Sequence, residues 1–239
     1  MAASDASCGN PNDRSTFKFT FDDLPPVGVT ADADPESPST IPMSNPYHRF
    51  QWSAGFSVLS APSKHSSDLM LEFDPLSLGN PSAPDAAQVG VGLWSATSCF
   101  RFDFHRMSVG CMSNGQNCVF NVTGVNTDID TGISSAATSQ TFTVPGCPSY
   151  QACTLTRITA DESSGLTNLT SILIDVKADG QPKKWWADDM QLAWTDAGCD
   201  AAVCRSKVRD SVAKRARWAV PGKPAGITSR LTRFVDAFY

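Results

Sequence analysis

Strict alternation of apolar and polar residues in short segments is the feature that most constrains the fold of this chain. Residues 16–24 read TFKFTFDDL, with Phe17, Phe19 and Phe21 on one face and polar residues between them. This two-residue period predicts a β-strand with one buried face. Further segments predicted to form strands lie at 47–60, where Gly55 separates two short strands, and at 99–108, 117–123, 140–144, 153–159, 170–177 and 185–195.

Turn residues separate these short segments, and no convincing amphipathic helix lies among them. The pattern therefore predicts an all-β fold, an antiparallel sandwich or barrel. Asp200 is placed to cap a helix over 201–217. We expect three parts: an N-terminal segment (1–14), a β-sandwich domain (15–199) and a basic, partly helical C-terminal extension (200–239).

The chain has eight cysteines, and six of them form close pairs in the sequence. We expect disulfides rather than zinc ligands, because zinc sites favour other spacings and the histidines are not in register with the cysteines. Free buried thiols are the other alternative. Cys8 would pair with Cys99 by elimination, although eight cysteines allow about 105 connectivities. The close pairs are Cys111 with Cys118, Cys147 with Cys153, and Cys199 with Cys204.

Two N-glycosylation acceptors agree with a disulfide-forming compartment. They are Asn121 in NVT and Asn168 in NLT. Together these features predict a secreted, extracellular glycoprotein. No apolar run in the sequence is long enough to span a bilayer, so we expect no membrane span.

The formal net charge of −5 hides an uneven distribution of charge. Residues 1–204 carry a balance of −12, whereas residues 205–239 carry nine basic and two acidic residues. Clustered cations can bind nucleic acid, but an extracellular protein rarely meets it, so we expect no nucleic-acid partner. The tail could instead dock on the acidic body, attract anionic cell-wall glycans, or be processed at the dibasic pair Lys214-Arg215.

Two Asp-Asp pairs, one ending the first predicted strand and one inside the last, are the most informative polar residues. Alternation places Asp23 on the side of Phe21, and Asp188 on the side of Trp186, so both carboxylates should face apolar surroundings. A buried carboxylate must be neutralised, hydrogen-bonded or bound to a metal. The first and last strands of a jelly roll often lie side by side, and hard oxygen ligands suit Ca²⁺. We therefore predict a structural Ca²⁺ site formed by Asp22, Asp23, Asp188 and Asp189.

Two other roles are open to these aspartates. They could cap turns or pair with Arg and Lys. They could also form a catalytic pair, which requires carboxyl groups about 5–10 Å apart across an open cleft. Strand ends close to a chain terminus do not favour such a cleft.

Aromatic residues are candidates for a sugar-binding platform, because a pyranose has an apolar face ringed by hydroxyl groups. Trp52 and Trp194 share the phase of apolar neighbours, which indicates the core. Trp185 and Trp186 must face opposite ways in a regular strand, and we expect Trp185 to be the exposed one. The predicted ligand-binding residues are Tyr47, His48, Trp94 and Trp185.

Asp103 and His105 lie on the polar side of one alternating segment. If the chain is an enzyme, they are the candidate acid–base or metal pair, although such a pair also fits an ordinary polar sheet surface. The sequence contains no GxSxG elbow, P-loop, dinucleotide fingerprint or HExxH pattern. No residue is therefore assigned a catalytic role.

Four strings occur in an order that resembles small secreted proteins of ascomycete fungi. They are FDDLPP at 21–26, IPMSNPYHRFQWSAGFSVLSAP at 41–62, MSVGCMSNGQNCVFNVTG at 107–124 and WWADDMQLAW at 185–194. The resemblance covers roughly residues 15–196 and implies a galactose-binding-like jelly-roll β-sandwich, similar to calcium-stabilised carbohydrate-binding modules. It implies no activity. The Trp185-Trp186 pair and the basic tail depart from the pattern.

Three functions follow, in order of preference. The first is a non-catalytic, calcium-stabilised protein that binds glycans or cell-wall polysaccharide. The second is a polysaccharide-active enzyme, a glycoside hydrolase or a lyase, on a jelly-roll scaffold. The third is a secreted effector whose basic tail contacts a host partner. Fold alone does not separate them.

Overall fold

The computed structural model describes residues 16–24, 39–61, 68–75, 86–161 and 165–207. Contacts divide the chain into one unit of Ser15–Asp196 and a second unit of Met1–Arg14 with Ala197–Tyr239. The described strands all belong to the first unit, and a helix over 199–207 belongs to the second.

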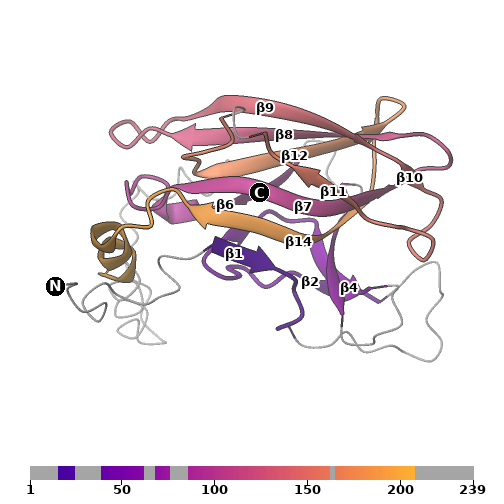
Figure 1. Cartoon of the computed structure of the whole chain (residues 1–239), viewed down its shortest axis with the longest axis horizontal. Helices are drawn as coiled ribbons and strands as arrows, with labels where there is room; N and C mark the ends of the chain where they lie inside the picture. The colour runs from indigo at the N-terminus through magenta and orange to yellow at the C-terminus, as the bar shows by residue number, and fades with distance from the viewer. Residues whose placement is uncertain (1–15, 25–38, 62–67, 76–85, 162–164, 208–239) are drawn as a thin grey trace, which may run out of the picture. The chain divides into compact units, whose positions relative to one another are not determined.

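The first unit consists of two antiparallel sheets (Figure 1). Sheet A has eight strands, in the order β10 (Gly146–Cys147), β7 (Phe102–Met112), β14 (Trp185–Trp194), β5 (Leu69–Phe73), β4 (Phe56–Ser60) and β2 (Ile41–Pro42), with β1 (Thr16–Phe19) beside β14 and β11 (Thr156–Thr159) beside β7. Among the strands that the structure describes, only β10 runs parallel to its neighbour. Sheet B has six strands, in the order β3 (Gln51–Trp52), β6 (Ala87–Gly90), β12 (Ser171–Ala178), β8 (Cys118–Thr127) and β9 (Ser134–Val144), with β13 (Gln181–Pro182) beside β12.

Neighbouring strands are mostly distant in the sequence. In sheet A, β14 lies between β7 and β5, and in sheet B, β12 lies between β6 and β8. The chain therefore passes repeatedly between the sheets, as in a jelly-roll β-sandwich. This confirms the predicted fold class. A short 3₁₀ helix, η3 (Gly92–Trp94), connects β6 to β7.

Aromatic side chains fill the space between the sheets. Trp185 on sheet A contacts Phe120 on sheet B with ring centroids 5.9 Å apart. Trp185 also contacts Phe56 and Phe73 in its own sheet and is only 1% exposed. The prediction that Trp185 is exposed is therefore wrong. The strand register places Trp185 on the inner face, because it pairs with Phe73 and Cys111, both of which are buried.

Strands β5 and β6 are among those that alternation did not predict. All five residues of β5 are buried, so the segment LMLEF shows no two-residue period. The four residues of β6 form too short a segment to carry a pattern. Gly55, with a φ of 95°, separates β3 from β4 as expected.

The helix in the second unit starts earlier than predicted. Ala202 donates its backbone N–H to the carbonyl of Gly198 at 3.0 Å, so Asp200 lies inside the first turn rather than capping it. The predicted continuation over 208–217 lies outside the described residues. Among the described residues, no helix has the length and apolar character needed to cross a bilayer.

The predicted disulfides Cys111–Cys118 and Cys147–Cys153 are present. Cys99, Cys199 and Cys204 are also disulfide-bonded, and no cysteine in the described part of the chain is free. Cys8 lies outside the described residues. The seven described cysteines thus form bridges rather than a zinc site.

Candidate functional site

The first and last strands of the sandwich are neighbours, as predicted (Figure 1). β1 runs antiparallel to β14, with Phe19 opposite Met190 and Lys18 opposite Gln191. This pairing brings the two Asp-Asp segments to the same region of sheet A.

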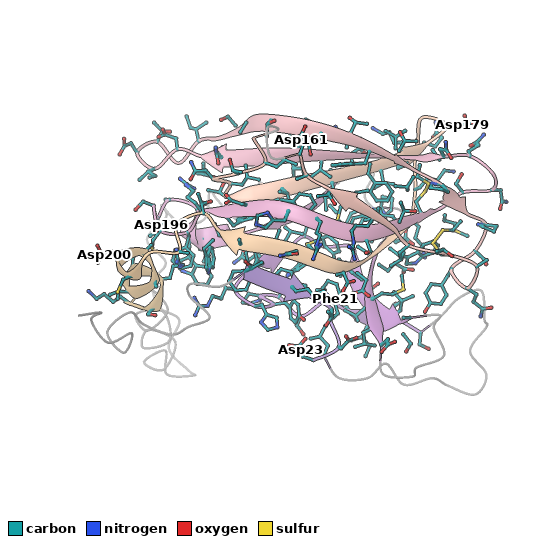
Figure 2. The ribbon with its side chains drawn as sticks, viewed as in Figure 1. Phe21, Asp23, Asp161, Asp179, Asp196 and Asp200 are labelled. Carbon is teal, nitrogen blue, oxygen red and sulfur yellow. A yellow bond between two sulfur atoms is a disulfide. The ribbon has the colours of Figure 1, made fainter. Side chains whose placement is uncertain are left out.

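Asp22 and Asp23 leave the alternation of β1 because the chain turns after the strand ends. Phe21 adopts a φ of 63°, and Leu24 donates its N–H to the Phe21 carbonyl at 3.0 Å. Figure 2 shows Phe21 and Asp23 beyond the end of β1. Phe21 is buried, whereas both aspartates are exposed. The prediction that Asp23 faces the core is therefore wrong.

Asp23 is held by two of the predicted ligand-binding residues. The Tyr47 hydroxyl donates to Asp23 Oδ1 at 2.5 Å, and His48 Nε2 lies 2.8 Å from Oδ2. Partial burial opposes ionisation of Asp23, yet these hydrogen bonds outweigh it and lower the pKa of the carboxyl. Burial, and then Asp23, raise the pKa of Tyr47 well above its usual 10.0. Tyr47 is buried and His48 exposed, so the two do not form an open aromatic platform.

Asp188 and Asp189 lie at a bulge in β14. The register against β7 shifts between Asp188 and Gln191, and Asp189 has a φ of 54°. Asp189 pairs with Lys18 at 2.6 Å, and its N–H donates to Asp188 Oδ1 at 2.6 Å. Burial raises the pKa of Asp188 to about 7, and the charges of Asp189 and Asp22 add to this rise. The charges of Asp189 and Asp22 thus both oppose ionisation of Asp188.

These four aspartates do not by themselves form a metal cage. In the described ranges, no group of three or more His, Cys, Asp or Glu side chains is arranged to hold a metal ion. Asp23 is bound to Tyr47 and His48, Asp189 pairs with Lys18, and Asp22 Oδ1 accepts from the Leu69 N–H at 2.8 Å. A Ca²⁺ ion here would need further oxygen ligands, such as backbone carbonyls.

Part of the outer face of sheet A forms a second, open site. Ser108 on β7 lies between Arg157 on β11 and Asp188 on β14. In the next row, Arg106 lies beside Gln191, which pairs with Lys18. Residues that alternate with these, including Met107, Val109, Ile158, Ala187 and Leu192, are buried on the inner face. We call the outward set the β7–β14 face: Lys18, Arg106, Ser108, Arg157, Asp188 and Gln191.

A disulfide-closed loop covers the adjoining part of the same outer face. Trp186 packs there against Leu59, Met70, Tyr150 and Cys147. Gly110, which pairs with Trp186, lies so close to the Cys153 sulfur that a Cβ atom would collide with it. The loop therefore buries Trp186 in a small apolar cluster and borders the open face.

A buried carboxylate lies beneath this cover. Glu72 Oε2 accepts from Trp186 Nε1 at 3.0 Å, and Lys184 Nζ lies 3.5 Å from Glu72 and 3.1 Å from Asp74. Burial, with a contribution from Glu72, raises the pKa of Tyr150 to about 12. Glu72 is thus neutralised within the fold and is not directed at a ligand.

Four side chains on the β7–β14 face have unused hydrogen-bonding capacity. Strands β7, β11 and β14 place them side by side, and they are partly or fully exposed. None makes a hydrogen bond or ion pair through its side chain within the described part of the chain. They are Arg106, Ser108, Arg157 and Gln191.

The remaining predicted residues lie elsewhere. Trp94 stacks on Phe100 with centroids 5.1 Å apart and is partly exposed. Asp103 Oδ1 accepts from the Asn168 N–H at 2.8 Å and from the Thr195 hydroxyl, so it ties neighbouring segments together. No hydrogen bond joins Asp103 to the exposed His105 among the described contacts.

Sequence reasoning missed the β7–β14 face. A bulge adds a residue to β7 beside Arg106, so Arg106 and His105 do not follow simple alternation. Arg157 and Ser108 do alternate with buried Ile158 and Met107, which was the available signal. The side chains of this face come together only because β7, β11 and β14 pair, and the pattern within one segment does not reveal which strands pair.

Solved structures similar to this chain are distant. One is a DUF4465 family protein from Bacteroides caccae, with 11% identity, a TM-score of 0.45, and coverage of 75% of this chain and 99% of that one. Another is the C-terminal family 22 carbohydrate-binding module of Clostridium thermocellum Xyn10B, with 12% identity, a TM-score of 0.39, and coverage of 63% and 87%. A third is the CBM22-2 xylan-binding domain of Paenibacillus barcinonensis Xyn10C, with 11% identity, a TM-score of 0.35, and coverage of 62% and 92%.

None of the curated proteins compared with the chain matches its sequence. A family model does. The model of the domain of unknown function DUF7371 matches residues 13–205, most of the chain, and the chain therefore belongs to this family.

Proposed function

We propose that the chain is a secreted, non-catalytic protein that binds glycans through the β7–β14 face, on a sandwich stabilised by Ca²⁺. The observation that carries the proposal is the row of Arg106, Ser108, Arg157 and Gln191, whose side chains are open and have no partner within the described residues. Polar side chains that a fold does not satisfy internally are available to a ligand.

The chemistry of these groups suits sugars. Each sugar hydroxyl both donates and accepts a hydrogen bond. Arginine supplies a planar set of donors, glutamine supplies both donors and acceptors, and serine supplies a hydroxyl that serves either way. Groups fixed on adjacent strands lose little freedom when they bind, which favours recognition of an extended chain.

Binding without catalysis fits the surroundings of the candidate pair. Asp103 is occupied by Asn168 and Thr195, and neither Asp103 nor His105 belongs to the β7–β14 face. Secretion is supported by the bonded cysteines. For Ca²⁺, the support is the repulsion of the Asp188 carboxylate by Asp22 and Asp189, which a cation would relieve.

A steric block tests the site. Ser108→Trp places a bulky side chain in the centre of the β7–β14 face, and Thr143→Trp places the same group at an exposed position of β9 in sheet B. We expect the unmodified protein and Thr143→Trp to bind the same polysaccharides on a broad glycan array, and Ser108→Trp to lose that binding. Thermal melting checks that both variants fold. Equal binding by both variants would contradict the site, and binding to no glycan would contradict the function.

A further inference from the structure

Two arginines are diagonal neighbours on the β7–β14 face. Arg157 on β11 is opposite Ser108, and Arg106 is two residues from Ser108 along β7. Such diagonal neighbours on paired strands lie about 7–8 Å apart, within reach of long side chains. One small anion between them could therefore contact both groups.

Neither arginine has an acidic partner in the described part of the chain. Three lysines in the described part of the chain are paired: Lys18 with Asp189, Lys177 with Asp175, and Lys184 with Asp74. Arg101 donates to the carbonyls of Ser95 and Thr127. Arg106 and Arg157 thus differ from these residues in keeping their donors free.

The carboxylates on the same face do not fill this position. Asp188 is on the far side of Ser108 from Arg157, two strand spacings away, which is about 10 Å. Asp189 is paired with Lys18. Asp188 is also a diagonal neighbour of Arg106, but it lies on the β14 side of β7, whereas an anion held between the two arginines would lie on the β11 side.

We infer that the glycan bound by this face carries carboxylate groups, as a polyuronide does, and that Arg106 and Arg157 together bind one uronate carboxylate. This inference rests on the proposed function. A planar carboxylate matches the planar fork of donors on a guanidinium and can accept two parallel hydrogen bonds from it. Ser108 and Gln191 lie beside the arginines, where they can bond to the hydroxyls of the same or the next sugar.

Matched ligands and variants test this inference. Binding of polygalacturonate is measured by calorimetry against fully methyl-esterified polygalacturonate, neutral xylan and dextran sulfate. The variants are Arg106→Gln, Arg157→Gln and the conservative Arg157→Lys. Lys177→Gln removes the same charge from sheet B and serves as the control. Melting temperature verifies the fold of each variant.

We expect polygalacturonate to bind at least ten-fold more tightly than its methyl ester, because esterification removes the charge and keeps the sugar chain. Each Arg→Gln change should weaken binding by at least ten-fold, because it removes charge-assisted hydrogen bonds to the carboxylate. Arg157→Lys should also bind weakly, because lysine lacks the planar fork. Lys177→Gln should bind normally, and added salt should weaken binding by the unmodified protein.

The other outcomes are distinct. Equal binding of the ester and the free acid, or of neutral xylan, would overturn the carboxylate assignment and leave glycan binding in place. Binding of dextran sulfate without polygalacturonate would overturn the choice of a uronate in favour of a sulfate ester. Binding of no glycan by the unmodified protein would overturn the proposed function as well.

Discussion

Asp188→Asn should stabilise the ion-free protein at high pH and have little effect at low pH. Burial raises the pKa of Asp188 from 3.8 to about 7. Below pH 4 the carboxyl is protonated in both the folded and the unfolded chain, so its burial has no ionic cost. Between these two values only the unfolded chain ionises, and stability falls as the pH rises. Above pH 7 the carboxyl is ionised in both states, and the folded protein is destabilised by the full cost of burying the charge.

The size of the effect follows from the shift in pKa. A rise of about three units corresponds to an upper limit of about 4 kcal/mol, at 1.36 kcal/mol per unit. Asp188 is partly exposed, and solvent screening reduces this to about 2 kcal/mol. For a domain of this size, 1 kcal/mol shifts the melting temperature by about 2–4 °C. We therefore expect Asp188→Asn to melt about 4–8 °C above the unmodified protein at pH 8, and at nearly the same temperature at pH 4.

The assay is thermal melting in a chelator from pH 4 to pH 9, read as the difference between variant and unmodified protein. Groups that titrate equally in both proteins cancel in this difference. Asparagine keeps the oxygen that accepts from the Asp189 N–H, so this hydrogen bond is retained. A difference that does not change with pH, or a variant that is less stable at pH 8, would refute the assigned burial of the charge.

Three further changes test other parts of the structure. Ca²⁺ at a hundred times its Kd should stabilise the unmodified protein by about 2.7 kcal/mol and so raise its melting temperature. It should not stabilise a variant with both Asp22→Asn and Asp188→Asn. Equal responses of the two proteins would exclude Asp22 and Asp188 as ligands. Trp185→Ala should lower the free energy of unfolding in urea by about 3–5 kcal/mol, as for other large core side chains, and a neutral result would contradict its burial. Tyr47→Phe should lower the free energy of unfolding by about 1 kcal/mol above pH 4. This loss should disappear as the pH falls through the lowered pKa of Asp23. A loss that does not depend on pH would mean that the hydroxyl does not act through that carboxylate.

Local patterns predicted many of the strands, but not the orientation of the polar side chains at strand ends. Alternation identified β1, yet the turn at Phe21 reversed the expected orientation of Asp23. Trp185 and Trp186 show a related limit. Both are about 1% exposed, because a loop closed by Cys147–Cys153 covers the outer one. A sequence period cannot reveal such a cover, since it arises from contacts between distant segments.

The two outer faces of the sandwich differ in a way that favours sheet A as the ligand-binding face. On sheet B, several polar side chains bond to one another. Ser139 donates to Asn121 at 2.6 Å, Thr123 donates to Ser139 at 3.2 Å, and Lys177 pairs with Asp175. These groups have little capacity left for a ligand, and a glycan attached to Asn121 would cover the same surface. On sheet A, the disulfide loop covers one part, and the open part contains the unpaired donors. Because the donors of Arg106 and Arg157 are not occupied by other described side chains, we expect binding to follow changes at these two residues rather than changes on sheet B.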